Sequence, residues 1–487
     1  MSGTNDISNT KDIAKDIKDI KDMKDMKDIN DTKDISEKIS AMKKAKELSF
    51  RYMENADSMR AFPSDQAIAA LDNLDGPLPE DGMPAEEVLE MLDKYAAPAT
   101  TGVTGGRYFG LVVGNVLPAA QGAEWLMNTW NQNASLYLAS PAASKTESIA
   151  EKWLVELMGF PKGTAMGTVT GSTNALLCAM TAARNYLLEK QGYDIHAKGF
   201  RGAPNIRLVM SEEVHSAVKS SLSVIGFGTE EAELIPCDDF GRVIPEEMPE
   251  LDDTCLVILQ AGNVNGGAFD PIGEICEKAN AAGAWVHVDG AFGLWACASP
   301  AQRVSVPGIE NADSWSCDAH KTLNSGYDCG LVFCKRPKAL ATALTAGAPY
   351  IEFSEHRDGM MYATEMSRRA YGFVLWSIVK SLGARGIAKM IDDMCDNAQY
   401  LGAKLKEAGI PLVNPPIFNQ MMIQFSSDEE TNAVLAAIQK SGTIWCGSSV
   451  FKGRTVIRIS ISSYSSTRED MDAAALVIKE AAASVCG

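Results

Sequence analysis

The stretch DAHKTLNSGYDCG, residues 318–330, places a lysine directly after a short apolar and polar run, DSWSC (residues 313–317). A lysine at the end of a strand is either an ordinary surface side chain or the amine that forms a Schiff base with a carbonyl compound. The residues around Lys321 indicate which of these two roles it has, and the same residues also predict the fold.

The sequence on both sides of this stretch alternates between strand-like and helix-like segments. Candidate strands are residues 206–210, 232–237, 255–260, 285–289 and 330–335, and candidate helices are residues 172–190, 214–226 and 272–283. This alternation predicts an α/β fold with a mostly parallel sheet and helices on both faces. Sheets of this kind bind ligands beyond the carboxyl ends of their strands.

Two short segments suggest binding of a phosphorylated, planar ligand. In GTVTGSTNALLCA (residues 167–179), Gly171, Ser172 and Thr173 lie where a strand turns into a helix, and backbone N–H groups at a helix N-terminus bind phosphate. His215 follows the strand at 206–210 and begins the next helix. Each has an ordinary alternative, since small residues are common at such turns and His215 could simply cap its helix or be half-buried.

Two further residues complete the pattern. Asp289 ends an apolar strand, where a carboxylate is costly unless it is paired, although it could also be a loop or cap aspartate. Lys321 follows 321 − 289 = 32 residues later, which leaves room for one crossover and the next strand. A phosphate cup, a stacking ring, a carboxylate for a protonated heterocyclic nitrogen and a Schiff-base lysine together describe a site for pyridoxal 5′-phosphate.

From about residue 75 onward the chain resembles the group II pyridoxal-phosphate-dependent amino-acid decarboxylases, the relatives of glutamate, aromatic-amino-acid and tyrosine decarboxylases. The motifs that carry the resemblance are RYFG (107–110), SPAASKTE (140–147), HVDGAFG (287–293), DAHKTLN (318–324) and YDCGLVFCK (327–335). The resemblance implies the fold type I architecture of pyridoxal-phosphate-dependent transferases, with a large domain, a smaller α+β C-terminal domain, and an active site at a homodimer interface.

The resemblance also assigns roles to residues. Lys321 matches the lysine that carries the cofactor, Asp289 the partner of the pyridinium nitrogen, and His215 the catalytic histidine that stacks on the ring. Gly171, Ser172 and Thr173 match the phosphate-holding turn, with His320 as a further cofactor contact. Tyr108 and Phe109 match a segment that lines the substrate pocket. The chain departs from the family at Thr322, where tryptophan is frequent, and at residues 262–265, Gly-Asn-Val-Asn, where many members have Gly-Thr-Thr.

Members of the family often use a loop tyrosine to return a proton to the substrate in the neighbouring subunit. The polar loop at residues 347–364 offers Tyr350 and Tyr362, and the order HRDGMMY before a helix favours Tyr362, although an ordinary surface tyrosine is an equal alternative. Arg458 is either a partner for a substrate carboxylate or a structural arginine.

The expected activity is therefore decarboxylation of an L-amino acid, with an aromatic or acidic side chain, to an amine and CO2. Two alternatives remain open: another reaction of the same cofactor, either transamination or C–C/C–S lysis, and a catalytically silent scaffold protein. A dinucleotide-binding enzyme is disfavoured because no G-x-G-x-x-G follows a strand.

Composition and organisation agree with a globular enzyme. The chain has 487 residues, a formal net charge of −18 and 11 scattered cysteines. The acidic charge disfavours nucleic acid as a partner, and the unpatterned cysteines indicate a reducing, cytoplasmic location. Neither a secretory signal, a membrane span nor a metal-binding pattern is expected.

Four segments are predicted along the chain: a low-complexity, disordered tail over residues 1–39, an N-terminal helical segment over 40–105, a large cofactor-binding domain over 106–378 and a small C-terminal domain over 379–487. The tail repeats an apolar residue mostly every third position between residues 11 and 35, a period that gives a helix no constant face. A partner-binding arm is the alternative. The spacing of Ser144 and Glu147 predicts a capping box at the start of a helix.

Overall fold

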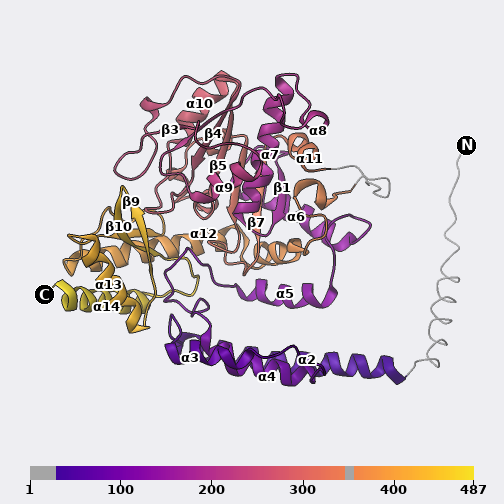
Figure 1. Ribbon diagram of the computed structural model, residues 1–487, viewed down its shortest axis with the longest axis vertical. Helices are drawn as coiled ribbons and strands as arrows, with labels where there is room; N and C mark the ends of the chain where they lie inside the picture. Colours follow the sequence, from indigo (N-terminus) through magenta and orange to yellow (C-terminus); the bar gives the residue numbers. More distant parts are fainter. Residues whose placement is uncertain (1–28, 346–355, 487) are drawn as a thin grey trace, which may run out of the picture. The chain divides into compact units, whose positions relative to one another are not determined.

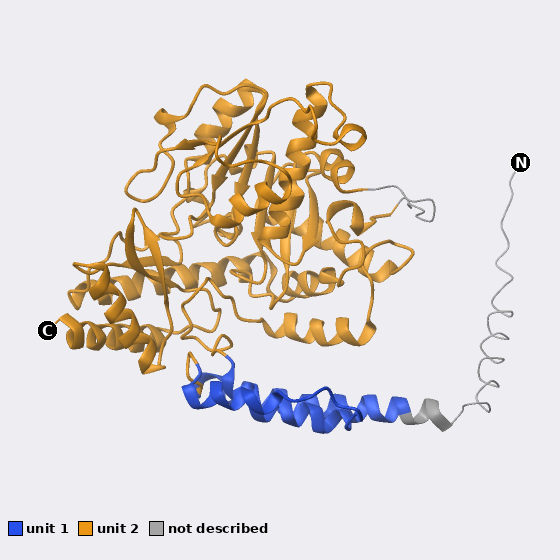
Figure 2. Ribbon diagram, viewed as in Figure 1, with its two compact units in different colours: residues 1–58, 63–100 blue, residues 59–62, 101–487 orange. Residues whose placement is uncertain are grey.

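The computed structural model describes residues 29–345 and 356–486, and it divides into two compact units, residues 1–58 with 63–100 and residues 59–62 with 101–487 (Figure 2). The predictions for residues 1–28 and for Tyr350 lie outside the described residues.

The first unit is helical. Its elements are α2 (Ile29–Glu54), η2 (Ala56–Ser58), α3 (Asp65–Ala69), η3 (Ala70–Leu74), α4 (Ala85–Tyr95) and η4 (Ala97–Ala99). An ion pair between Lys44 and Glu90, 2.9 Å long, links α2 to α4. Residues 29–39, which the sequence assigns to the tail, belong to α2, where an i,i+4 ion pair between Asp34 and Lys38 favours the helix.

A seven-stranded sheet is the centre of the second unit (Figure 1). Its strands lie in the order β1-β7-β6-β5-β4-β2-β3, with parallel pairing from β6 to β3 and with β7 antiparallel to both of its neighbours. The strands are β1 (Ala165–Val169), β2 (Arg207–Ser211), β3 (Glu233–Ile235), β4 (Cys255–Gln260), β5 (Trp285–Asp289), β6 (Ser314–Asp318) and β7 (Gly330–Cys334). The mostly parallel sheet that the sequence predicts is confirmed, including the strands expected before Gly171 and before Lys321.

Helices connect and cover these strands. They are α5 (Pro118–Trp130), α6 (Pro141–Met158), α7 (Ser172–Lys190), α8 (Ile195–Lys198), α9 (Ser216–Val224), α10 (Ile272–Ala282), α11 (Pro337–Leu344) and α12 (Tyr371–Glu407), with short 3-10 helices η5 (Pro245–Glu247), η6 (Gly293–Ala298), η7 (Arg303–Ser305), η8 (Ile309–Asn311) and η9 (Gly359–Tyr362).

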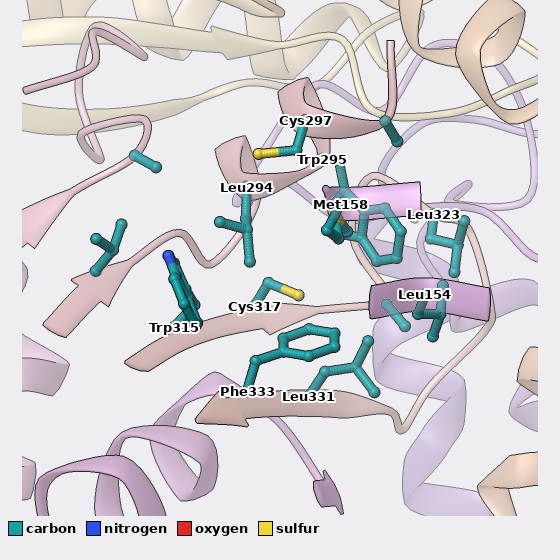
Figure 3. Packing of buried hydrophobic residues seen from close by; sticks show 14 of the residues in the cluster. Leu154, Met158, Leu294, Trp295, Cys297, Trp315, Cys317, Leu323, Leu331 and Phe333 are labelled. Atoms are coloured by element: carbon teal, nitrogen blue, oxygen red, sulfur yellow. The ribbon is translucent and has the colours of Figure 1, made fainter. Parts of the chain in front are cut away.

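The strands bury side chains on both faces. In β4, Val257 and Leu259 belong to one buried apolar cluster, and Leu256 and Ile258 belong to another. Successive residues of a strand point to opposite faces, so a strand covered on both sides is apolar throughout. Figure 3 shows part of the first cluster, where side chains from α6, β6 and β7 pack together.

The end of the chain forms the smaller α+β part of this unit. A three-stranded antiparallel sheet has the order β8-β10-β9, and its elements are β8 (Gln420–Ile423), α13 (Asp428–Ser441), β9 (Gly447–Phe451), β10 (Arg454–Ser460) and α14 (Arg468–Cys486). The boundary predicted between residues 378 and 379 falls inside α12, shortly before Gly383, whose φ of 61° and ψ of 176° interrupt the helix. The domain boundaries themselves stay predictions.

The capping-box prediction is wrong. Helix α6 begins at Pro141, and the side chain of Ser140 caps it by accepting the N–H of Ala143. Ser144 lies one turn inside the helix, where its hydroxyl donates to the carbonyl of Arg357. Glu147 is 1 % exposed and pairs with arginine side chains far along the chain.

Within residues 29–345 and 356–486, no helix is both long enough and apolar enough to cross a membrane. In the same part of the chain, no three side chains of the kinds that ligate metals come together in a possible metal site. The described cysteines are free thiols, and most of them are buried.

Candidate active site

A cavity of about 560 Å³ lies at the carboxyl ends of β4, β5 and β6, within the second unit. This volume is in the range of small-molecule sites. The lining residues include Ser172, Thr173, Glu213, His215, Gln260, Asp289, Lys321, Ser448, Ser449 and Arg458. The structure therefore brings together the lysine, the aspartate, the histidine and the helix start that the sequence singled out.

Lys321 follows β6 in a tight turn. Its Nζ lies 3.0 Å from Oδ2 of Asp318, the last residue of that strand. The next side chain, Thr322, is fully buried and donates its hydroxyl to the carbonyl of Phe292. Gly114 lies against the carbonyl of Lys321 so closely that a Cβ there would overlap it. Contacts on both sides therefore fix the backbone that presents the lysine.

Asp289 is the last residue of β5 and is 7 % exposed. Its Oδ1 accepts the N–H of Ala291 at 3.2 Å and the hydroxyl of Ser316 at 3.4 Å. Burial raises the pKa of its carboxyl to about 6, and the nearby Lys321 opposes that shift. A cationic ring nitrogen placed beside this carboxyl would favour its ionised form.

His215 lies at the N-terminus of α9. Its Nδ1 accepts the N–H of Ala217 at 3.0 Å, so the ring both caps the helix and faces the cavity. Burial lowers the pKa of the imidazole, and the positive charges of Lys321 and Arg458 lower it further. The neutral ring with its proton on Nε2 is therefore the favoured form.

The turn from β1 into α7 is the place where the sequence predicts a phosphate cup. Gly171 caps α7 with extended backbone, and Ser172 and Thr173 line the cavity. The N–H of Ser172 donates to Oδ1 of Asp318 at 2.5 Å. Gly330 lies so close that a Cβ on it would be 2.5 Å from Cα of Gly171. The turn that follows β1 is thus held between the end of β6 and the start of β7, and only glycine fits at position 330.

Several predicted site residues lie beside the cavity without lining it. His320 is 7 % exposed, accepts the N–H of Cys329 through Nδ1, and stacks on Tyr327. Tyr108 stacks on Trp445 with ring centroids 4.8 Å apart, and Phe109 is 1 % exposed in the apolar cluster of the smaller sheet. Adjacent residues of an extended segment face opposite ways, so this segment sends Phe109 into the core.

Tyr362 ends η9 and also lies away from the cavity of its own chain. Its ring is half-buried beside the second apolar cluster, and the guanidinium of Arg357 lies 4.4 Å from the ring centroid. Its proposed role as an acid therefore concerns the site of a partner subunit.

Sequence reasoning missed several residues that line the cavity or contact its lysine, among them Asp318, Gln260 and Glu213. Asp318 could have been noticed from its place three residues before the lysine. Glu213 lies two residues before His215, and burial raises the pKa of its carboxyl. Gln260 ends β4, and nothing in the sequence pattern separates it from an ordinary strand residue.

The residues present fit pyridoxal 5′-phosphate. The α7 N-terminus with the hydroxyls of Ser172 and Thr173 suits a phosphate, Asp289 suits a pyridinium nitrogen, and Lys321 suits an aldehyde. Gln260 is 2 % exposed, and among the described residues its Nε2 has no hydrogen-bond partner. A buried donor of this kind is costly unless a ligand accepts from it.

Comparison with known proteins points to the same cofactor. The family model "Pyridoxal-dependent decarboxylase conserved domain" matches residues 70–412. The acidic amino acid decarboxylase GADL1 from Xenopus tropicalis is 28 % identical over 351 residues, which cover 69 % of this chain and 67 % of that protein. Phenylacetaldehyde synthase from a Rosa hybrid cultivar is 26 % identical over 420 residues, covering 79 % and 81 %.

A solved structure shares the fold. The structure of Oryza sativa TDC with PLP and tryptamine superposes with a TM-score of 0.84 at 20 % identity, covering 94 % of this chain and 99 % of that one.

Proposed function

Because the chain belongs to the pyridoxal-dependent decarboxylase family and is a pyridoxal-phosphate-dependent amino-acid decarboxylase, we propose that it converts an aromatic or acidic L-amino acid into the amine and CO2. The main observation that supports the proposal is that Lys321, Asp289 and His215 line one cavity at the start of α7. Transamination and lysis would use the same residues, and the family match favours decarboxylation over them.

Each side chain in the cavity has a separate role in the proposed reaction. When bound, pyridoxal 5′-phosphate accepts the electron pair that departing CO2 leaves on the substrate's α-carbon. Lys321 holds the cofactor covalently, and the charge of Asp289 keeps a proton on the ring nitrogen. The neutral imidazole of His215 packs on the ring without adding a second positive charge. Ser172 and Thr173 hold the phosphate and so fix the ring's position.

Arg458 is the proposed partner for a substrate carboxylate. Its side chain reaches the cavity from β10 and donates from Nη1 to the carbonyl of Val264 at 2.9 Å. Burial lowers the pKa of its guanidinium, and no ion pair of Arg458 is present within the described residues. A half-buried and unpaired cation at a cavity favours an anionic ligand, because a charge partly removed from water is stabilised by a counter-charge.

A panel of L-amino acids tests the activity. We expect the purified protein, supplied with cofactor, to release CO2 and one amine from an aromatic or acidic substrate. Replacing Arg458 by glutamine should raise KM about 10-fold or more, since a hydrogen-bonded charge contact is lost. Arg454→Gln is the matched control, an exposed arginine on the same strand. Formation of a keto acid in place of amine would contradict the proposal, and an unchanged KM would remove Arg458 from it.

A homodimer with shared active sites is also proposed. Helix α4 has no buried residue in the single chain, and the first unit leaves large apolar side chains exposed. They are Ile35, Ile39, Met42, Phe50, Met53, Ile68, Leu71, Leu74, Leu78, Met83, Val88 and Leu92. An apolar surface of this extent is stabilised by burial against a second copy of the chain, as the family resemblance implies.

Tyr362 is proposed as the acid that returns a proton to the substrate in the partner's site. Replacing it by phenylalanine should slow protonation of the α-carbon by about 10²–10⁴-fold, the usual effect of removing a positioned acid. The electron-rich carbon then has time to react with O2, which takes up two electrons and becomes H2O2, and hydrolysis by one water yields an aldehyde and ammonia. We therefore expect the ratio of aldehyde to amine to rise, as measured by product mass and peroxide assay.

Subunit mixing provides the control for the shared site. Lys321→Ala and Tyr362→Phe proteins, each impaired alone, should regain activity after exchange of subunits, because one hybrid site holds both native residues. An unchanged product ratio in the single variant would exclude Tyr362 as the acid, and failure to recover after verified exchange would place each site within one chain.

A further inference from the structure

Asp318 binds one of the backbone donors that are expected to hold the cofactor's phosphate, so the inference drawn from it rests on the cofactor site of the proposed function. Its Oδ1 accepts the N–H of Ser172, the first residue of α7, at 2.5 Å. The first N–H groups of a helix are the donors that bind a phosphate. A carboxylate of the protein itself therefore takes one of the donors in the cup.

This carboxylate is almost completely buried, with 2 % of its surface exposed. A phosphate monoester carries a charge near −2 at neutral pH, with a second pKa of about 6. Two negative groups at one helix start repel each other, and the low exposure of Asp318 leaves little water to screen that repulsion. The N-terminus of α7 can favour either anion but cannot give the same N–H fully to both.

Without the cofactor, Asp318 is well compensated. Its Oδ2 lies 3.0 Å from Nζ of Lys321, and its Oδ1 lies 3.7 Å from Nε2 of His320. Burial lowers the pKa of His320, so that imidazole is favoured as a neutral ring. Among the described residues, Lys321 is thus the one ammonium or guanidinium within ion-pair distance of Asp318.

Attachment of the cofactor weakens the ion pair between Asp318 and Lys321. The ammonium of Lys321 has three N–H donors. Its nitrogen bonds to the aldehyde carbon with loss of one water, and at most one N–H then remains. The same event brings the phosphate to the helix start. Cofactor binding therefore weakens the favourable contact of Asp318 and adds an unfavourable one.

We propose that Asp318 competes with the phosphate group of the cofactor for the N-terminus of α7, so that this protein holds pyridoxal 5′-phosphate weakly and exchanges it with cofactor in solution. The Asp318–Lys321 pair stabilises the cofactor-free state, and occupancy follows the free cofactor concentration. Asp318 is a positioning residue here, since it acts through the helix start and the lysine.

Binding of two ligands to cofactor-free protein tests the proposal. Pyridoxal 5′-phosphate and pyridoxal share the aldehyde and the ring, and only the first has the phosphate. Asp318→Asn keeps a side-chain oxygen for the N–H of Ser172 and removes the charge. We expect this variant to bind pyridoxal 5′-phosphate about 10-fold more tightly or better than the native protein. Pyridoxal should gain clearly less affinity, because only the loss of the Asp318–Lys321 pair favours it; both affinities are measured by equilibrium dialysis and absorbance titration.

Asp313→Asn is the matched control. Asp313 is 1 % exposed and lies at the opposite end of β6, paired with Arg336. It should leave both affinities unchanged in folded protein. Unchanged or weaker binding of pyridoxal 5′-phosphate by Asp318→Asn would overturn the proposal. An equal gain for both ligands would also overturn it, because Asp318 would then act on Lys321 alone.

If the variant does not fold, the affinities of the native protein for the two ligands provide an independent test. Its affinity for pyridoxal 5′-phosphate should exceed that for pyridoxal by less than about 10-fold, because repulsion by Asp318 offsets much of what the phosphate gains at the helix. An advantage of about 10³-fold or more would contradict the competition. These binding measurements need no substrate, so a negative result for Asp318 would leave the proposed decarboxylation intact. If neither ligand bound to the native protein, the assignment of the cofactor itself would be wrong.

Discussion

The Lys321→Ala protein is expected to lose both covalent attachment of the cofactor and nearly all turnover. Lys321 is the one described lysine that lines the cavity, and its amine is the nucleophile that takes the aldehyde of the cofactor. Removing a nucleophile that the chemistry requires should lower the rate on the order of 10³-fold or more. Borohydride reduction followed by peptide mapping should find cofactor on Lys321 in native protein and nowhere in the variant.

Two further variants separate covalent chemistry from charge. Lys321→Arg keeps a cation for Asp318 but cannot form the bond, so it should be as inactive as Lys321→Ala while retaining more thermal stability. Lys338→Ala removes an exposed lysine shortly after β7 and should behave as native protein. A cofactor adduct on any other lysine, or appreciable turnover by Lys321→Arg, would refute the assignment.

Replacing Glu147 by glutamine should cause the largest loss of stability. Glu147 is 1 % exposed, and its carboxylate pairs with Arg368 at 2.8 Å and with Arg357 at 3.0 Å. Its pKa lies below the ordinary value, because the two guanidinium groups outweigh the effect of burial. Removing one partner leaves buried charges uncompensated, which typically costs about 3–5 kcal/mol. The midpoint of denaturant unfolding should fall accordingly.

An exposed glutamate provides the comparison. Glu274 pairs with Lys278 on the surface of α10, and Glu274→Gln should cost less than about 1 kcal/mol. The double variant Glu147→Gln/Arg368→Met should cost less than the sum of its single changes, since the two residues share one contact. Equal midpoints for Glu147→Gln and Glu274→Gln would show that the buried cluster does not stabilise the fold.

This cluster also bears on Tyr362. Arg357 contacts Glu147, Glu151 and the ring of Tyr362. Loss of Glu147 should therefore disturb the segment that presents the proposed acid, and a changed ratio of aldehyde to amine in Glu147→Gln is expected alongside the loss of stability.

The sequence was sufficient to predict those site residues whose positions follow from the local pattern of strands and helices. Asp289 ends a strand, Lys321 follows one, and Gly171 and His215 each directly precede a helix, so strand and helix periodicity places all four at one edge of a mostly parallel sheet. Their meeting in one cavity follows from strand order, since β5 and β6 are neighbours.

Contacts between distant segments could not be predicted. Ser144 and Glu147 have the spacing of a capping box, but Ser140 and Pro141 begin the helix, and Glu147 is instead buried against Arg357, 210 residues away in sequence. The hydrogen bond from the N–H of Ser172 to the carboxylate of Asp318 likewise joins residues 146 positions apart in the sequence. A single sequence carries no signal for either pairing.

The reversed direction of β7 has a consequence for insertions and deletions. Because β6 and β7 pair antiparallel from Ser314 with Cys334 to Asp318 with Gly330, Lys321 lies in the connection of a hairpin rather than in a helical crossover. Inside that connection, Oδ1 of Asn324 accepts the N–H groups of Asn115 and Tyr464. Any change in the number of residues between 319 and 329 would therefore break these contacts or shift the strand register. Natural length variation among relatives should be absent from this segment and concentrated in surface connections.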